Sequence, residues 1–130
     1  MPLIEWAESF SVGVDQLDAD HKQLINIINR VDAAQKANGS ISWAIDELSD
    51  YARYHFKREE RMMKDAGYTD QVDHRRRHKE FLEWLRSVQA TLKMMPDAQY
   101  HLGADVRDYL GRWLTEHILV EDMKYKGELA

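Results

Sequence analysis

Two residue pairs near the middle of the sequence have the types and spacing of metal ligands. They are His55 with Glu59, and His74 with His78. The members of each pair are four residues apart, so on a helix they lie on the same face. Imidazole and carboxylate groups both bind metal ions, and two such helices could direct four ligands into one space. Three further candidate ligands occur elsewhere in the chain: His21, His117 and Asp122.

The elements that must position these residues are four amphipathic helices. Apolar residues recur at alternating spacings of three and four in residues 18–37, 41–65, 69–93 and 103–120, which is typical of the inward face of packed helices. Gly39 and Gly67 mark two short turns, and a longer link at residues 94–102 contains Pro96. This arrangement predicts an all-α, up-down-up-down four-helix bundle. We expect a single domain spanning residues 1–130, with an extended N-terminal arm packed across the bundle (1–17), the bundle itself (18–120) and a polar tail (121–130).

The polar candidates occupy positions that the helical pattern places in the interior. Five of the six histidines, together with Glu59, are in register with Leu, Ile, Val and Trp. Burying such groups without compensation costs several kcal/mol each, which a domain of this size cannot tolerate. We therefore interpret them as metal ligands. The sixth histidine, His101, falls in the link before the last helix, and we expect it to be exposed.

The number and type of the ligands favour two metal ions. Seven ligands are too many for one tetrahedral zinc, and histidine with carboxylate suits iron, zinc or manganese. If two carboxylates bridge the metals, the five histidines must divide as three and two. One metal then keeps a vacant position for a small molecule.

The same residues resemble the hemerythrin family, specifically its bacterial single-domain form. The resemblance covers nearly the whole chain. It comprises His21 on the first helix, His-x-x-x-Glu on the second, His-x-x-x-His on the third, and His117-Ile-Leu-Val-Glu-Asp122 at the end of the fourth. All seven positions of the family pattern are matched.

This resemblance implies a non-haem di-iron centre, with an oxygen bridge, that binds dioxygen reversibly. One iron would be held by His74, His78 and His117, and the other, with the open position, by His21 and His55. Glu59 and Asp122 would bridge the two irons. The implied role is oxygen storage, transport or delivery, so the protein would not be an enzyme, although minor oxidase or peroxidase-like activity would be compatible with the site.

The interval from His117 to Asp122 departs from regular helical spacing. A separation of five residues turns Asp122 about 140° away from the ligand face on an ideal helix. We therefore predict a bulge or a loosened turn near residues 119–121. Glu121, four residues after His117, is the alternative bridging ligand, although the family pattern favours Asp122.

Apolar residues should keep water away from the open iron position. Leu24 lies three residues after His21, and Leu114 lies three residues before His117, so both should point near the metals. Three further candidates for this oxygen pocket are Phe56, Trp113 and Ile118. The alternative for each of the five residues is a plain role in the bundle core.

Composition excludes several other classes of protein. The chain has no cysteine, which excludes disulfides, zinc-thiolate sites and iron–sulfur clusters. Its net charge of −5 disfavours nucleic acid and anionic membranes as partners. No apolar run approaches the roughly 20 residues of a membrane span, and the N-terminus does not resemble a secretory signal. We expect a cytoplasmic monomer, in which Arg75, Arg76 and Arg77 form a solvated helix face.

Alternative functions remain at this stage. A di-iron enzyme or a protein that handles iron, peroxide or nitric oxide could use the same ligands, as could an oxygen or redox sensor. The sequence offers no additional acid–base residue for an enzyme and no output domain for a sensor. It also does not identify an oxygen-consuming protein that would receive dioxygen.

Overall fold

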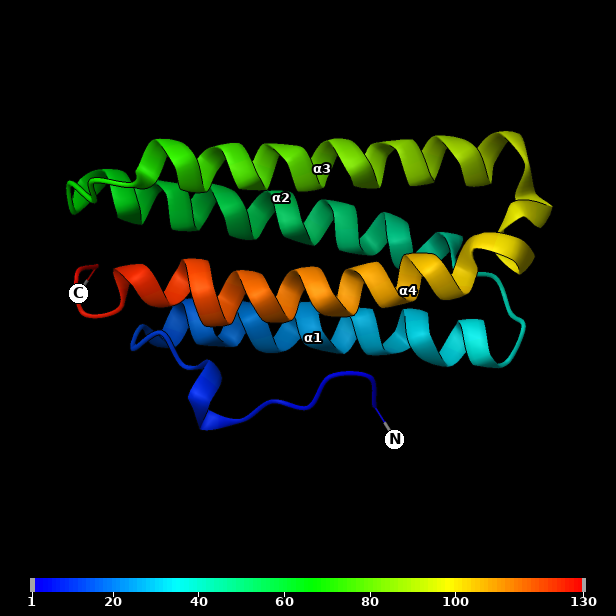
Figure 1. The fold of residues 1–130 in the computed structure, drawn as a ribbon, viewed down its shortest axis with the longest axis horizontal. Coiled ribbons are helices and arrows are strands. Elements are labelled where there is room, and N and C mark those ends of the chain that lie inside the picture. The colour runs from blue at the N-terminus through cyan, green and yellow to red at the C-terminus, as the bar shows by residue number, and fades with distance from the viewer. Residues whose placement is uncertain (1, 130) are drawn as a thin grey trace.

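Four long helices form an antiparallel bundle in the computed structural model, which describes residues 2–129. They are α1 (Asp15–Lys36), α2 (Ser42–Asp65), α3 (Gln71–Met94) and α4 (Gln99–Glu116). Helix α1 packs against α2 and α4, and α2 packs against α3, so that sequential helices run up and down along one common direction (Figure 1). The predicted all-α, up-down-up-down bundle is confirmed.

The helix bounds differ from the expected ones at both ends of the bundle. Helix α1 begins at Asp15, so the arm ends before residue 15 and not at residue 17. Pro96 opens a short 3-10 helix (Pro96–Ala98) that leads directly into α4, because its fixed φ angle suits a first helical position. The link is therefore shorter than residues 94–102. Beyond α4, a π-helix (His117–Glu121) and a 3-10 helix (Asp122–Tyr125) continue the chain into the segment that was expected to be a polar tail.

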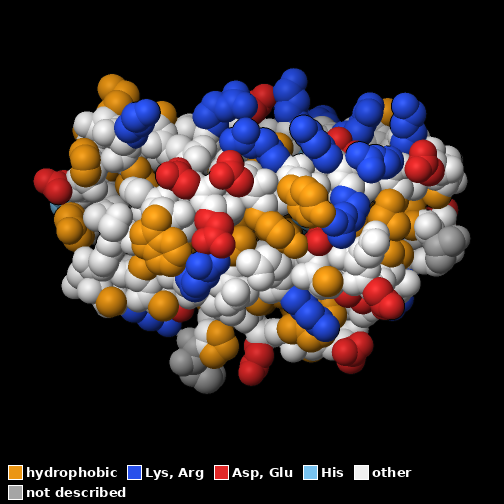
Figure 2. Space-filling view, turned by 180° about the vertical axis from the view of Figure 1, so that it is seen from behind, with side chains coloured by type: hydrophobic (Ala, Val, Ile, Leu, Met, Phe, Trp, Pro, Cys, Tyr) orange, Lys and Arg blue, Asp and Glu red, His pale blue; other side chains and the backbone are white. Residues whose placement is uncertain are grey.

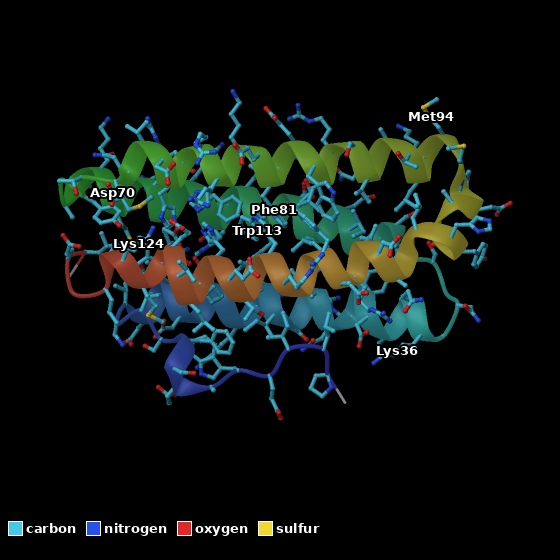
Figure 3. All side chains as sticks on the ribbon, in the orientation of Figure 1. Lys36, Asp70, Phe81, Met94, Trp113 and Lys124 are labelled. Carbon is cyan, nitrogen blue, oxygen red and sulfur yellow. The ribbon has the colours of Figure 1, made fainter. Side chains whose placement is uncertain are left out.

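Aromatic side chains join α3 to α4. The rings of Phe81 and Trp113 stack with their centroids 3.9 Å apart, and the two side chains point toward each other between the helices (Figure 3). Further along the same seam, the ring centroids of Trp84 and Tyr109 lie 4.0 Å apart. Large rings in this position hold the two helix backbones apart while filling the space between them.

The N-terminal arm runs beside α1 (Figure 1), and Leu3 brings it against α4. The backbone N–H of Ile4 donates to Oδ1 of Asn29 over 2.9 Å, and Nδ2 of Asn29 donates to the carbonyl of Ile4 over 2.8 Å. A Cβ atom on Gly111 would meet the Leu3 side chain at 3.1 Å, so the arm approaches the α4 backbone closely there. Among the described residues, no helix has both the length and the hydrophobicity needed to cross a bilayer.

Candidate metal centre

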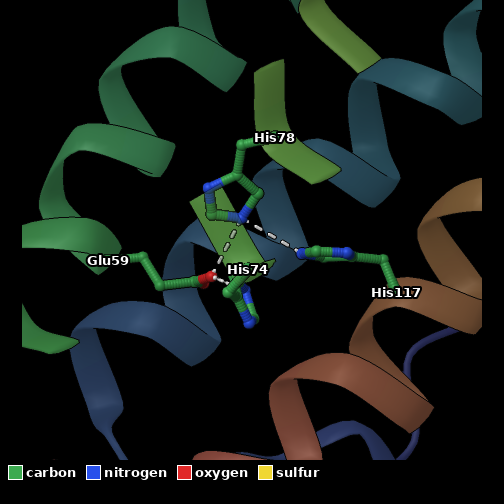
Figure 4. Close-up of side chains that lie close together, drawn as sticks. All are labelled: Glu59, His74, His78 and His117. Carbon is green, nitrogen blue, oxygen red and sulfur yellow. Dashed lines mark hydrogen bonds and ion pairs between the residues drawn. The ribbon is translucent and has the colours of Figure 1, made fainter. Parts of the chain in front are cut away.

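The bundle brings all seven predicted ligand side chains together in its interior. None of them exposes more than 5% of its surface. Glu59, His74, His78 and His117 each offer an atom within 4.8 Å of the others (Figure 4). His21, His55 and Glu59 form a second group of the same kind. The histidines therefore divide into a set of three and a set of two, which share Glu59.

The two carboxylates lie between the two sets of histidines. Oε1 of Glu59 is 2.7 Å from Nε2 of His74, and its Oε2 is 3.1 Å from Nε2 of His55. Oδ1 of Asp122 is 2.9 Å from Nε2 of His74, and its Oδ2 is 3.1 Å from Nε2 of His21. Each carboxylate thus faces one set with one oxygen and the other set with its second oxygen, which is the geometry that bridging two cations requires.

A π-helix at His117–Glu121 explains how Asp122 reaches the centre. The predicted irregularity near residues 119–121 is confirmed, because the wider turn brings a residue at an interval of five onto the ligand face. Glu121 is mostly buried but pairs with cations outside the centre, since its carboxylate lies 3.3 Å from Nε of Arg77 and 3.2 Å from Nζ of Lys124. The inward carboxylate is therefore that of Asp122, and the alternative of Glu121 is not supported.

His21 and Asp122 show whether these residues fit a metal ion. Neither ring nitrogen of His21 and neither carboxylate oxygen of Asp122 has a hydrogen-bond partner among the described residues, although all four atoms are buried. Nε2 of His21 and Oδ2 of Asp122 lie close together without the angles of a hydrogen bond, so both are directed at the same space. Buried polar atoms without partners are costly in a native fold. Imidazole and carboxylate donors suit divalent and trivalent iron, and cations in this space would satisfy Nε2 of His21 and the carboxylate oxygens of Asp122.

Electrostatics in the metal-free site lead to the same conclusion. Burial disfavours a charged His21, but the neighbouring carboxylates of Asp122 and Glu59 outweigh burial and raise its pKa to about 10. At His74, too, burial lowers the pKa, but Asp122 and Glu59 outweigh burial and raise it to about 10. Burial would raise the pKa of Glu59, yet four surrounding histidines hold it well below its usual range. The two carboxylates stay ionised and require positive charge nearby, which either protons or metal ions can supply.

Two of the histidines are oriented from behind by carboxylates outside the centre. Nδ1 of His55 donates to Oδ2 of Asp20 over 2.9 Å, and Nδ1 of His78 donates to Oε2 of Glu60 over 2.8 Å. These contacts leave the Nε2 atoms directed inward, as is usual for metal-binding histidines. The sequence reasoning missed both carboxylates. Asp20 could have been found, because it lies three residues after Leu17 and four before Leu24 on the buried face of α1, whereas Glu60 gave no such signal.

A tyrosine from the final 3-10 helix also contacts the centre. The buried hydroxyl of Tyr125 donates to Oε2 of Glu59 over 3.1 Å. The chain has six tyrosines, and the sequence alone does not identify the one that makes this contact. The 3-10 helix that follows the π-helix buries the Tyr125 ring beside those of Tyr68 and His74, next to the candidate ligands.

The candidate residues of the oxygen pocket lie in the apolar part of the bundle. Phe56 stacks on His78 with ring centroids 3.8 Å apart, and the half-buried Trp113 stacks on His117 at 4.4 Å. The other three candidates are buried members of the same core: Leu24, Leu114 and Ile118. Their burial fits both a pocket and a plain core, so their role stays a prediction. His101 is exposed, as expected.

Comparisons with known families match most of the chain. Residues 12–129 match the family described as "Hemerythrin HHE cation binding domain". The bacteriohemerythrin of Stenotrophomonas maltophilia is 30% identical over 99% of this chain and 83% of its own length. Myohemerythrin-1 of Phascolopsis gouldii is 36% identical over 95% of this chain and 92% of its own length.

Solved structures show the same similarity. A crystal structure titled as wild-type hemerythrin superposes with a TM-score of 0.79 at 27% identity, over 98% of both chains. A hemerythrin variant superposes with a TM-score of 0.86 at 26% identity, over 99% of this chain and 98% of the other. The likeness includes the helices that carry the buried histidines and carboxylates.

Proposed function

Since the chain belongs to the hemerythrin family, we propose that it binds dioxygen reversibly at a non-haem di-iron centre, for oxygen storage, transport or delivery. The observation that carries the proposal is the pair His21 and Asp122, whose buried side chains face each other and have no hydrogen-bond partner within residues 2–129. Two irons held there would supply the electrons and the open coordination position that reversible dioxygen binding needs. The names of its relatives, bacteriohemerythrin and myohemerythrin, agree with this role.

Each ligand has a place in the proposed centre. His74, His78 and His117 would hold one iron, and His21 and His55 would hold the other. Glu59 and Asp122 would be the ligands shared by both irons, because each has one oxygen toward either set of histidines. The set of two histidines would give its iron fewer protein ligands, so the open position would belong to that iron.

Residues outside the centre keep these ligands in position. Asp20 and Glu60 accept the Nδ1 protons of His55 and His78, which leaves the Nε2 lone pairs free to face inward. The hydroxyl of Tyr125 restrains one oxygen of Glu59. Preorganisation of this kind lowers the cost of ordering ligands when an ion binds.

The apolar residues around the centre exclude water. Leu24, Leu114 and Ile118 are buried, and Phe56 covers one face of the His78 ring. We propose that these side chains would keep water and protons away from the open position of the centre.

Metal analysis followed by oxygen cycling tests the proposal. The purified protein should contain two irons per chain. It should be reduced without air, exposed to oxygen and then deoxygenated, while its ligand-to-iron charge-transfer absorption is followed. Full return over repeated cycles would support reversible binding. Irreversible conversion to ferric protein with release of peroxide would instead favour a di-iron enzyme, and stoichiometric zinc would contradict the centre. The cytoplasmic location and the monomeric state stay predictions.

A further inference from the structure

A groove between α2 and α3 lies on the surface directly outside the candidate centre. Its volume is about 790 Å³, and its walls carry six cationic and two anionic side chains. The whole chain has a net charge of −5, so this concentration of positive charge is local. Lys and Arg side chains form a row along the upper part of the molecule when it is seen from behind (Figure 2), where α2 and α3 lie. The six cations are Arg53, Lys57, Arg75, Arg76, Lys79 and Arg86.

Most of this positive charge is free to meet a partner. Arg76 is neutralised by Asp73 and Glu80, at 2.7 and 2.6 Å. The other five cations are exposed and form no ion pair within residues 2–129. On α3 the cations recur at intervals of four and seven residues, and on α2 at an interval of four, so both helices present them to the same groove. A merely solvated face does not require this alignment across two helices.

The groove also reaches one of the candidate metal ligands. Phe56, His78 and Glu60 line it. The His78 ring lies parallel to the Phe56 ring with centroids 3.8 Å apart, and its Nδ1 bonds to Glu60. Its Nε2 faces Glu59 at 3.2 Å inside the centre. One imidazole therefore separates the groove from the space between the ligands.

The neighbouring surface has the opposite electrostatic character. A smaller cavity of about 230 Å³ beside His117 is lined by Glu80, Glu116 and Glu121, with Arg77 as its only cation among the described residues. An acidic protein would be repelled there and attracted to the α2–α3 groove. Charge complementarity thus distinguishes two routes to the same set of histidines.

We propose that the α2–α3 groove docks an acidic one-electron carrier protein, of the iron–sulfur or flavin class, which re-reduces the centre after it has become ferric. This inference rests on the proposed di-iron function. In each encounter one reduced carrier is oxidised by one electron, and one ferric ion becomes ferrous. Two encounters restore the pair, and no covalent bond of the protein forms or breaks. The path for the electron is the His78 imidazole, with Phe56 stacked on it.

Charge reversal in the groove tests the proposal with an acidic [2Fe–2S] ferredoxin as the probe. The test variant is Lys57→Glu with Lys79→Glu, one residue from each wall. The control is Lys93→Glu with Lys126→Glu, which changes the net charge equally at two exposed positions outside the groove. Affinity is measured between the oxidised ferredoxin and the ferric protein, where no electron is transferred. The rate of reduction by reduced ferredoxin is measured separately by stopped flow.

We expect the groove variant to bind ferredoxin at least about tenfold more weakly than the parent, and to be reduced at least about tenfold more slowly at low salt. The parent rate should fall as ionic strength rises, and the control variant should follow the parent. Reduction by the methyl viologen radical, a small cation, should be undiminished in the groove variant. Slower reduction by this radical as well would indicate damage to the centre and would overturn the docking interpretation.

The remaining outcomes also decide the matter. Equal ferredoxin affinity and rate in the groove variant and the parent would overturn the proposal, even if both bind dioxygen reversibly. In another outcome, the parent fails to bind dioxygen reversibly, while the groove variant is still reduced by ferredoxin more slowly than the parent. That result would refute the proposed function and keep the docking site. If charge reversal abolishes binding of a short DNA duplex but leaves ferredoxin binding unchanged, the groove serves a nucleic acid and the proposal is wrong.

Discussion

Nδ1 of His55 lies 2.9 Å from Oδ2 of Asp20, so a buried carboxylate on α1 orients a histidine on α2. The other oxygen of Asp20 accepts from the Tyr51 hydroxyl over 3.0 Å. Burial would raise the pKa of Asp20, but its bonds to His55 and Tyr51 and the nearby Arg58 lower it, so the carboxylate is ionised. Asp20 thereby acts on the set of two histidines, whereas Glu60 acts on the set of three.

Replacing Asp20 by Asn should weaken the binding of one metal ion more than the other. The amide has no charge and is a poorer acceptor for the Nδ1 proton, so His55 loses part of its orientation. Loss of such an outer contact typically costs about 10-fold to 100-fold in metal affinity. The measurement is iron retained per chain against increasing chelator, where one iron should leave early. Asp50→Asn, at an exposed position on α2, is the control. Retention equal to that of the parent would show that Asp20 does not support His55.

Two adjacent carboxylates offer a direct test of the bridging ligand. Asp122→Asn should reduce the iron content below two per chain, because Asp122 faces both sets of histidines. Glu121→Gln removes an equal charge from the adjacent residue, which pairs with Arg77 and Lys124 outside the centre, and should leave the iron content unchanged. Iron content and the charge-transfer spectrum are measured for both variants. The reverse result would make Glu121 the ligand.

The interior histidines and the helical bundle could be predicted because both depend on local periodicity. A histidine in register with leucines on one helix face must point inward, and four such faces require one shared core. The interval from His117 to Asp122 predicted an irregular turn, because a regular helix would place Asp122 on another face. The structure has a π-helix there.

Contacts between distant elements could not be predicted in the same way. Glu60 meets His78 only because α2 and α3 pack at one particular register, and no periodic signal distinguishes Glu60 from a solvated glutamate. The helix bounds at Asp15 and Gln99 also differ from the expected ones, since the apolar pattern marks where a helix is packed and not where it starts. Likewise, the arginines at residues 75–77 look alike in sequence, but only Arg75 and Arg76 line the α2–α3 groove.

Leu114→Ala should accelerate conversion of the oxygenated protein to the ferric state. Leu114 is buried three residues before His117, and removing its side chain leaves space that water can enter near the centre. The rate of loss of the oxygenated absorption measures the effect. Leu110→Ala is the matched control, because Leu110 is buried in the same core one turn further from His117 and its loss costs a similar amount of stability, about 2–5 kcal/mol. Equal rates for Leu114→Ala and the parent would remove Leu114 from the pocket.

Loading the metal-free protein with ferrous iron should release protons at pH 8. His21 and His74 each have a pKa of about 10 in the metal-free site, so both carry a proton at this pH. Metal binding requires neutral imidazoles, so these protons must leave. A pH indicator in weakly buffered, oxygen-free solution should record at least about two protons per loaded chain, because Asp20 and Glu59 raise the pKa of His55 as well. His21→Gln should release fewer, and release of none by the parent would contradict the protonated state of the site.

The thermal stability of the metal-free protein should fall as pH rises from 6.5 to about 10. The pKa of His21 and of His74 is raised from 6.5 to about 10 on folding, because Asp122 and Glu59 outweigh the effect of burial. A raised pKa in the folded state gives stability that is complete below pH 6.5 and is lost as the proton leaves between pH 6.5 and 10. Melting followed by circular dichroism in the presence of a chelator should show a fall of at least about 5 °C over this range. The iron-loaded protein should lack this trend, because its imidazoles hold metal and not protons. A metal-free protein that becomes more stable toward pH 10 would show that Glu59 and Asp122 do not hold protons on these histidines.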